Sequence, residues 1–128
     1  MLIGGKRPKR RGYFYEPTVI TDIDPQSEIL KTEIFGPVAP IVAFDDVDDA
    51  VSQANDTIYG LVSYVFGETG RALAVAQKLD AGMVGVNRGF ISDPAAPFGG
   101  MKQSGIGREG SQDGIQEFLE KQYIAVEW

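Results

Sequence analysis

The sequence predicts an α/β protein with parallel strands, and two features of the chain lead to this fold class. Short runs rich in β-branched and aromatic residues alternate with helix-length stretches whose apolar residues recur every three or four positions. Helices of this length form crossovers, and crossovers join parallel strands. We therefore expect a parallel β-α-β-α-β core over residues 38–86, followed by a long loop, a C-terminal helix and a terminal strand.

Composition and charge narrow the class of protein. The chain has 128 residues, of which 43% are hydrophobic, enough for one domain with a modest core. Its net charge of −6 argues against a nucleic-acid partner for the chain as a whole. No apolar run approaches the roughly 20 residues that cross a bilayer, so we expect no membrane partner. No signal region follows Met1, and we expect a cytoplasmic location.

Two residue types that often carry chemistry do not occur in this sequence. Without cysteine there is no disulfide, no thiolate metal site and no cysteine nucleophile. Without histidine the commonest general base and metal ligand is missing, which excludes a Ser-His-Asp triad. We therefore expect no metal site in these residues.

The run Lys6-Arg7-Pro8-Lys9-Arg10-Arg11 is a local exception to the acidic balance. Such a run could be a patch for nucleic acid or lipid. A solvated loop before a strand is the commoner structure for a charge run, and it is our interpretation here.

The elements expected in residues 13–44 are short. Residues 13–20 are aromatic and β-branched, so we expect an extended segment, and Pro17 restricts it to an edge. Asp24 followed by Pro25 predicts a helix start, with the helix running to about Lys31. Pro37 ends any helix before it, and residues 38–44 predict a buried strand.

The predicted helices of the core alternate with its strands. Acidic residues at 45–49 favour a helix start there, and the apolar residues Val47, Ala50, Val51 and Ala54 share one face. Residues 61–66 and 83–86 predict strands. Thr69 is the expected cap of the helix between them, with Gly82 as its C′ residue. That helix has the apolar stripe Ala72, Val75, Ala76 and Leu79.

The stretch from Asn87 to Ser111 has no apolar period and contains six glycines and two prolines. A loop of this length in a compact domain is usually functional or disordered. Its residues Phe90, Ile91, Phe98 and Ile106 need burial, so we predict an ordered loop that wraps a ligand site. It leaves the carboxyl end of a parallel strand, which is where such sheets bind ligands. After it, Ser111 can cap a helix that presents Ile115, Phe118 and Leu119 on one face.

Within this loop, residues 105–110 match the Gly-x-Gly-x-x-Gly pattern of dinucleotide sites. That fingerprint needs a strand directly before it and a βαβ unit around it. Here Lys102-Gln103-Ser104 precedes it, so we interpret the glycines as sites of tight turns or close packing.

Three other side chains have ordinary explanations when each is taken alone. Glu33 could be a solvated acid, Ser92 a turn residue, and Glu109 the partner of Arg108 in an ion pair. Only their neighbours in the sequence favour a functional interpretation.

Several motifs occur in order and cover nearly the whole chain. They are Gly12-Tyr13-Phe14-Tyr15-Glu16-Pro17-Thr18, Glu33-Ile34-Phe35-Gly36-Pro37, Asn55-Asp56-Thr57 with Tyr59-Gly60-Leu61, and Pro97-Phe98-Gly99-Gly100-Met101-Lys102-Gln103-Ser104-Gly105. Together they resemble the C-terminal part of the aldehyde dehydrogenase superfamily. Within it, residues 87–92 and 107–111 are most like succinate-semialdehyde dehydrogenase.

The resemblance implies oxidation of an aldehyde to an acid with NAD or NADP. A cysteine thiolate attacks the carbonyl, hydride passes to the nicotinamide, and water hydrolyses the thioester. The resemblance also implies a partial catalytic domain over residues 1–121 and an oligomerisation strand over residues 122–128, hence a homo-oligomer. For the isolated strand, an open apolar edge seeks a partner.

Roles for single residues are implied by the same resemblance. Glu33 matches the glutamate that holds the nicotinamide ribose hydroxyls, and Phe35 the aromatic beside that ribose. Ser92 and Phe98 match the substrate tunnel, where a serine reaches the carboxylate of succinate semialdehyde. Glu109 matches a glutamate behind the active site that can relay protons or hold water.

The chain departs from the family in what it lacks. In family members the nucleophilic cysteine, the general-base glutamate, the oxyanion asparagine and the Rossmann domain all lie upstream. We therefore expect these residues to be a piece of a longer enzyme, inactive by themselves. Two alternatives stay open, which are a dehydrogenase of another aldehyde and a non-catalytic fragment that associates with itself.

Overall fold

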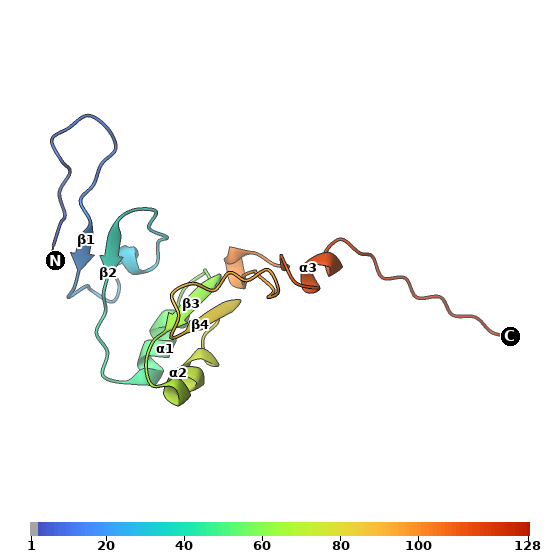
Figure 1. Cartoon of the computed structure of the whole chain (residues 1–128). Helices are drawn as coiled ribbons and strands as arrows, with labels where there is room; N and C mark the ends of the chain where they lie inside the picture. Colours follow the sequence, from blue (N-terminus) through green and yellow to red (C-terminus); the bar gives the residue numbers. More distant parts are fainter. Residues whose placement is uncertain (1–2) are drawn as a thin grey trace. The chain divides into compact units, whose positions relative to one another are not determined.

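The computed structural model describes residues 3–128, which divide into two compact units, Met1–Ala50 and Val51–Trp128. The predicted α/β class is confirmed, because both strand pairs are parallel. The predicted division into a domain over 1–121 and a strand over 122–128 stays a prediction. The elements, labelled in Figure 1, are β1 (Thr18–Ile20), the 3-10 helix η1 (Glu28–Leu30), β2 (Val38–Pro40), α1 (Val47–Asn55), β3 (Val62–Val65), α2 (Thr69–Ala76), β4 (Met83–Val86), the 3-10 helix η2 (Lys102–Ser104) and α3 (Asp113–Gln116).

The first unit is organised around the parallel pair β1–β2, in register from Thr18 opposite Val38 to Ile20 opposite Pro40. Strand β1 begins directly after Pro17, as the restriction on proline in strands leads one to expect. The strand predicted over 38–44 is shorter than expected and ends at Pro40. The ladder ends with a hydrogen bond from the Ile41 N–H to the Ile20 carbonyl at 2.8 Å, and Asp22, with φ +53°, leaves the extended conformation two residues after β1.

The helix predicted from Pro25 to Lys31 is wrong in length and type. The Asp24 carboxylate does accept a hydrogen bond from the backbone of Gln26 at 2.9 Å, as a cap would. However, the Ser27 N–H donates to the Asp24 carbonyl at 2.8 Å, which closes a turn, and only the short η1 follows. A helix this short makes too few hydrogen bonds to offset the cost of nucleation.

The second unit contains the parallel pair β3–β4 and the helix α2, which packs against both strands (Figure 1). Among residues 3–128, the buried apolar side chains are Val51, Ala72 and Ala81. All three are small, because the backbones of helix and strands lie close together at these positions. Helix α1 begins as predicted, since the Asp46 carboxylate accepts hydrogen bonds from the backbones of Asp48 and Asp49 at 2.8 and 3.0 Å.

The strands do not form the single three-stranded sheet that the β-α-β-α-β pattern predicts. They form two separate pairs, β1–β2 and β3–β4. The segment after β2, from Ile41 to Phe44, is exposed and carries no strand. The early end of β2 at Pro40 therefore removes the residues that would have extended the predicted strand.

The start of α2 differs from the sequence prediction. Its N-cap is Glu68 rather than Thr69, and the Glu68 carboxylate accepts hydrogen bonds from the backbones of Gly70 and Arg71, both at 2.9 Å. These two bonds lower the pKa of Glu68 from its usual 4.5, because they stabilise the charged form. The partial positive charge of the helix N-terminus favours an anion at the same place.

The predicted role of Gly82 as a helix C′ residue is also wrong. Helix α2 ends at Ala76 with Gln77 as its C-cap, several residues before Gly82. Gly82 is instead a point of close backbone approach, because a Cβ atom there would overlap the carbonyl oxygen of Gly99. The glycine therefore lets the long loop pack on the start of β4.

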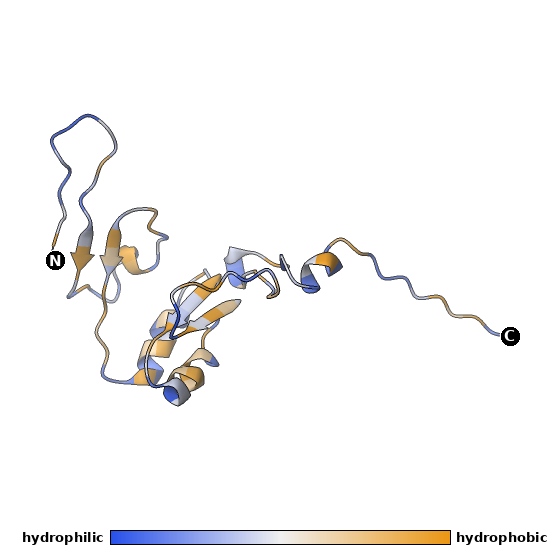
Figure 2. Ribbon diagram, viewed as in Figure 1, coloured by the Kyte–Doolittle hydropathy of each residue, from blue (hydrophilic) through white to orange (hydrophobic). Residues whose placement is uncertain are grey.

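The C-terminal elements are shorter than predicted. Helix α3 is a single turn, and its apolar residues face solvent, with Phe118 just beyond it 89% exposed. Residues 119–128 have no strand partner, so the predicted terminal strand does not form within the single chain. A strand needs a neighbour for its hydrogen bonds, and its role in oligomer formation stays a prediction. Apolar residues are visible on α3 and along the segment after it (Figure 2).

No helix in the part of the chain that the structure describes is long and apolar enough to cross a membrane.

The Glu68 cap makes the stability of α2 depend on pH. Because the folded pKa lies below the unfolded value, the cap stabilises α2 above about pH 4.5 and this stabilisation is lost as the pH falls through the folded pKa. In Glu68→Gln the neutral amide does not titrate, so we expect this acid transition to disappear from amide exchange in α2. Thr69→Ala is the matched control and should keep the wild-type profile. Identical pH profiles for E68Q and the wild-type chain would contradict the capping assignment.

Candidate substrate and cofactor site

The loop over residues 87–111 leaves β4 at a residue in an unusual backbone conformation. Asn87 has φ +53°, in the left-handed region that asparagine tolerates better than most residues. Its side-chain amide donates to the Gly67 carbonyl at 2.9 Å and accepts from the Gly67 N–H at 2.8 Å. The side chain thus extends the β3–β4 pairing by one step while the backbone turns away from the sheet.

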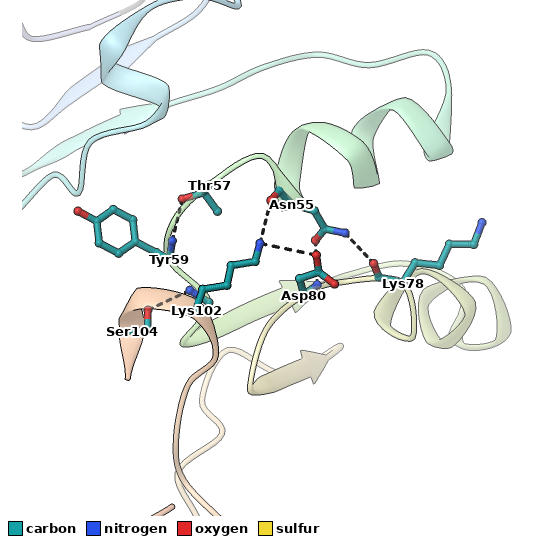
Figure 3. Close-up of polar contacts among 8 residues, drawn as sticks. Asn55, Thr57, Tyr59, Lys78, Asp80, Lys102 and Ser104 are labelled. Carbon is teal, nitrogen blue, oxygen red and sulfur yellow. Dashed lines mark hydrogen bonds and ion pairs between the residues drawn. The ribbon is translucent and has the colours of Figure 1, made fainter. Parts of the chain in front are cut away.

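A second anchor lies at η2, where Lys102 also has a left-handed φ of +55°. Its ammonium group donates to the Asn55 carbonyl at 2.8 Å and lies 3.7 Å from the Asp80 carboxylate (Figure 3). The Asn55 side chain binds the segment after α2, donating to the Lys78 carbonyl and accepting from the Asp80 N–H, both at 2.8 Å. Lys102 therefore ties the loop to the ends of α1 and α2.

Backbone pairing around Gly60 completes this anchor. The Gly60 carbonyl accepts from the N–H groups of Gly82 and Met101, both at 2.9 Å. The Gly60 N–H donates to the Ser104 hydroxyl at 2.9 Å, a contact drawn in Figure 3. A Cβ atom at Gly60 would lie 2.8 Å from the Asp80 carbonyl, so no larger residue fits here without movement. The back of the loop is thus seated on residues 58–60.

The loop ends at a third residue with left-handed backbone, Ser111, whose φ is +49°. Its hydroxyl accepts from the Asp113 N–H at 3.1 Å and donates to the Asp113 carboxylate at 3.2 Å. The start, middle and end of the loop are therefore each held by a side chain at a position where a non-glycine residue is strained. The loop is thus anchored at three points, but the burial expected for Phe90 and Ile106 is wrong, since these side chains are 68% and 99% exposed. A ligand site wrapped by the loop stays a prediction.

Between the second and third anchors, Phe98 and Glu109 lie opposite each other in an antiparallel bridge. The Phe98 N–H donates to the Glu109 carbonyl at 2.8 Å, and the Glu109 N–H donates to the Phe98 carbonyl at 2.7 Å. The structure thus brings together two of the residues that the sequence selected, one for the substrate tunnel and one for proton relay.

Arg108 supports this bridge and does not pair with Glu109. Its guanidinium donates to the carbonyls of Gly100 and Gly107 at 2.9 and 2.7 Å. Its backbone N–H donates to the Glu117 carboxylate at 3.2 Å. The ordinary ion pair between Arg108 and Glu109 is therefore not formed within residues 3–128, and the Glu109 side chain is exposed.

The glycines of residues 105–110 serve as turns, as the sequence analysis preferred. Gly105, Gly107 and Gly110 have φ values of +111°, +89° and +69°. Gly105 ends η2, and no strand precedes it, so the context of a dinucleotide fingerprint is not met.

Two cavities flank the Phe98–Glu109 bridge. The larger, of about 640 Å³, is lined by both of these residues together with Arg108, Ile115 and Phe118 among others. The smaller, of about 280 Å³, is also lined by Phe98, with Arg88, Ile91 and Asp93 among others. Phe98 therefore lines both cavities, which fits a residue in the wall of a binding site.

Ser92 is exposed and does not line either cavity, although its neighbours Ile91 and Asp93 line the smaller one. Alternate residues of an extended segment point to opposite sides, which explains this difference. The structure therefore does not bring Ser92 together with Phe98 around one cavity, and its role in substrate binding stays a prediction.

The predicted cofactor residues lie in the first unit, between η1 and β2. Glu33 is exposed, and Phe35 is 93% exposed. A carboxylate without a protein partner can accept two ribose hydroxyls, and an exposed ring can pack on a sugar, so the donor set fits a nicotinamide nucleotide. Residues 3–128 contain no group of three acidic side chains placed to hold a metal ion.

Sequence reasoning did not find the anchors Asn87, Lys102 and Ser104. An asparagine directly after a strand is a recognisable signal, because asparagine favours left-handed turns. No sequence signal identifies Lys102, because its partners lie 47 and 22 residues earlier in the chain.

A parallel β-α-β unit, with an anchored glycine-rich loop at the carboxyl end of its last strand, defines an α/β protein of the ligand-binding kind. The chain matches the aldehyde dehydrogenase family over residues 1–124, and it belongs to that family.

Individual relatives agree with this assignment. A probable NADP(+)-dependent succinate-semialdehyde dehydrogenase of Sinorhizobium fredii is 50% identical over 124 residues, 96% of this chain and 25% of that protein. The crystal structure of succinate-semialdehyde dehydrogenase from Burkholderia pseudomallei is similar with a TM-score of 0.83 at 47% identity, covering 91% of this chain and 24% of that one. An apo betaine aldehyde dehydrogenase structure from Staphylococcus aureus is similar with a TM-score of 0.86 at 45% identity. The similarity covers 96% of this chain and 26% of that one. The chain thus spans about a quarter of the length of these relatives.

The anchors at Asn87 and Lys102 can be tested by removing the side chain while keeping the left-handed backbone conformation accessible. Asn87→Gly and Lys102→Gly relieve the strain of a left-handed residue but delete the side-chain bonds. We expect the amides of Phe98 and Glu109 to exchange about five- to tenfold faster, because each lost hydrogen bond contributes about 0.5–1.5 kcal/mol. The readout is site-resolved hydrogen exchange by NMR.

Asp22, with φ +53° in the first unit, provides the matched control for these variants. Asp22→Gly should leave exchange at Phe98 and Glu109 unchanged. Unaltered exchange in N87G and K102G would show that the loop holds its shape without these side chains.

Proposed function

We propose that this chain is part of an NAD- or NADP-dependent dehydrogenase that oxidises succinate semialdehyde to succinate. The observation that supports it most is the 50% identity over 124 residues to a succinate-semialdehyde dehydrogenase. The overall reaction consumes the aldehyde, water and oxidised cofactor, and it yields the acid, reduced cofactor and a proton. The nicotinamide, when bound, supplies the acceptor for hydride.

In this proposal Glu33 and Phe35 bind the cofactor. The Glu33 carboxylate accepts both ribose hydroxyls, and each hydrogen bond to a charged group contributes roughly 1.5–3 kcal/mol. The Phe35 ring packs beside the same sugar. The exposure of both side chains supports this role, because neither is engaged in a core of its own.

Phe98 and Ser92 contribute to substrate binding, and Glu109 holds or moves a proton. Phe98 lines two cavities, and Glu109 is fixed opposite it by two backbone hydrogen bonds. A serine hydroxyl can donate one hydrogen bond to the substrate carboxylate, whereas selection of a charged substrate normally needs a bidentate arginine as well. That arginine would come from upstream residues.

We propose further that the chain alone has no dehydrogenase activity, that the full enzyme is a homo-oligomer, and that it acts in the cytoplasm. The reaction needs a thiolate nucleophile, and these 128 residues contain no cysteine. We expect no reduced nicotinamide above the blank when the chain is incubated with succinate semialdehyde and NAD or NADP. The measurement is the absorbance of the reduced cofactor. Turnover by the purified chain would refute the prediction that the chain alone is inactive.

The substrate is tested by placing residues 1–124 in the position of the equivalent quarter of the Sinorhizobium fredii relative. If the proposal holds, this chimera oxidises succinate semialdehyde. Ser92→Ala should then lower kcat/KM for succinate semialdehyde about tenfold or more relative to butanal, because it removes a hydrogen bond to a charged group. Ser52→Ala, an exposed serine on α1, is the control. Equal losses for both aldehydes would remove the carboxylate role of Ser92.

A second candidate is a dehydrogenase of a different aldehyde. The similarity to betaine aldehyde dehydrogenase at 45% identity favours testing it. A chimera that prefers betaine aldehyde to succinate semialdehyde would support this alternative.

A third candidate is a non-catalytic fragment that associates with itself. The exposed apolar residues beyond α3, including Tyr123, Ile124 and Trp128, favour it. Light scattering at high protein concentration tests this candidate, because it gives the molar mass in solution. A monomeric mass would count against self-association.

A further inference from the structure

The first unit displays a loop that the dehydrogenase function does not use. Residues 6–16, which we call the basic loop, leave the β1–β2 pair and return to it. The Glu16 N–H donates to the Lys6 carbonyl at 3.0 Å, which closes the loop. The buried Thr18 hydroxyl, at its foot, accepts from the Gly5 N–H at 2.8 Å and donates to the Glu16 carbonyl at 2.7 Å.

The foot of the basic loop is tightly packed. A Cβ atom at Gly4 would lie 2.8 Å from the Thr18 Cα, and Ile3 bridges Val19 in antiparallel fashion. The loop is therefore presented to solvent from a fixed base, and its tip is strongly hydrophilic (Figure 2).

The basic loop concentrates positive charge that no carboxylate pairs with in the residues the structure describes. Residues 1–20 hold five basic side chains and one acidic one, a net charge of +4, whereas the whole chain carries −6. Within residues 3–128 none of the five forms an ion pair, although the chain has 18 carboxylates. The five exposed cations are Lys6, Arg7, Lys9, Arg10 and Arg11.

Aromatic rings follow directly after the cations. Tyr13 is fully exposed, and Phe14 and Tyr15 are 44% and 46% exposed. The Arg10 guanidinium lies 3.6 Å from the centroid of the Phe14 ring, so a planar cation is already stacked on an aromatic face. No aliphatic residue occurs between Gly4 and Pro17.

We propose that the basic loop is a binding site for single-stranded nucleic acid. Unpaired cations neutralise phosphates, and exposed rings stack on bases, which is the combination that single-stranded sites use. A duplex hides its base faces, so it could engage the cations but not the rings. An anionic membrane is a poorer fit, because membrane-surface segments insert aliphatic and aromatic residues together and this loop has no aliphatic ones.

The acidic balance of the whole chain does not prevent this binding. At physiological ionic strength the screening length is about 8 Å, so carboxylates farther from a phosphate than this act weakly. The run from Lys6 to Arg11 is the solvated loop before a strand that the sequence predicts, and the proposal adds a ligand for it. The inference is independent of the proposed dehydrogenase function.

The test is a fluorescence anisotropy titration of a labelled oligothymidylate of about 20 nucleotides with the purified chain. Five phosphate contacts predict a slope of log K against log salt of about −3.5, so affinity should fall about 100-fold between 50 and 200 mM salt. Replacing all five cations by glutamine should abolish binding. The double variant Arg10→Gln with Arg11→Gln should bring the slope from about −3.5 to about −2.1, because two phosphate contacts are lost. This smaller change serves as a second test in case the five-residue variant fails to fold.

Two matched controls separate the site from general charge. Glutamine at Lys31, Arg71, Lys78 and Lys121 brings the net charge to −10, close to the −11 of the loop variant, and should leave the slope nearly unchanged. Tyr13→Ala should weaken binding about fivefold or more at constant slope, because base stacking is lost. Tyr123→Ala, equally aromatic and 89% exposed, should not.

Four results would contradict the proposal, and the first three concern binding itself. These three are no saturable binding at 50 mM salt, equal losses in the loop and control charge variants, and binding to phosphatidylserine vesicles but not to the oligonucleotide. The third result would assign the basic loop to a membrane surface. Tighter binding of a duplex than of the single strand would also contradict the stacking role of Tyr13.

Discussion

The close approach of the long loop to the start of strands β3 and β4 is the constraint on which the second unit depends. The Gly60 carbonyl accepts hydrogen bonds from two backbone N–H groups, one of Gly82 directly before β4 and one of Met101 in the loop. This shared acceptor is possible because Gly60 and Gly82 carry no side chain. The contact fixes where the loop begins its return, and through Ser104 and Lys102 it positions the Phe98–Glu109 bridge.

Backbone hydrogen bonds hold this unit together more than a hydrophobic core does. The buried apolar side chains of the described residues are small, and many large ones face solvent. Burial of apolar surface contributes about 25 cal/mol per Å², so a chain that leaves its aromatic residues exposed gains little from this term. Since the chain spans about a quarter of its relatives, these exposed faces are candidates for contacts with the rest of an enzyme.

The candidate residues fall in two units that are each organised by their own contacts. Glu33 and Phe35 lie in the first unit, between η1 and β2, and Phe98 and Glu109 lie in the second, in the loop after β4. Their roles in cofactor and substrate binding stay predictions, and the chain contains no cysteine that could serve as the nucleophile.

Local chemistry allowed several parts to be predicted from sequence. The period of apolar residues located α1 and α2, and the β-branched runs located β3 and β4. Acidic residues before α1 capped it as expected, because a carboxylate satisfies free N–H groups wherever a helix begins. The glycines at 105, 107 and 110 were recognised as turns, and family motifs selected the residues of the candidate site.

The sequence by itself therefore determined the fold class, the main elements and the family, because these follow from periodicity and from short motifs. Tertiary structure alone decided the split into two strand pairs, the close contact at Gly82, and the anchoring of the loop by Asn87 and Lys102. These features join residues 17 or more positions apart, and no local pattern records which distant backbone will approach. Sequence alone also could not decide whether the residues beyond α3 form a strand, because a strand exists only when a neighbour supplies its hydrogen bonds.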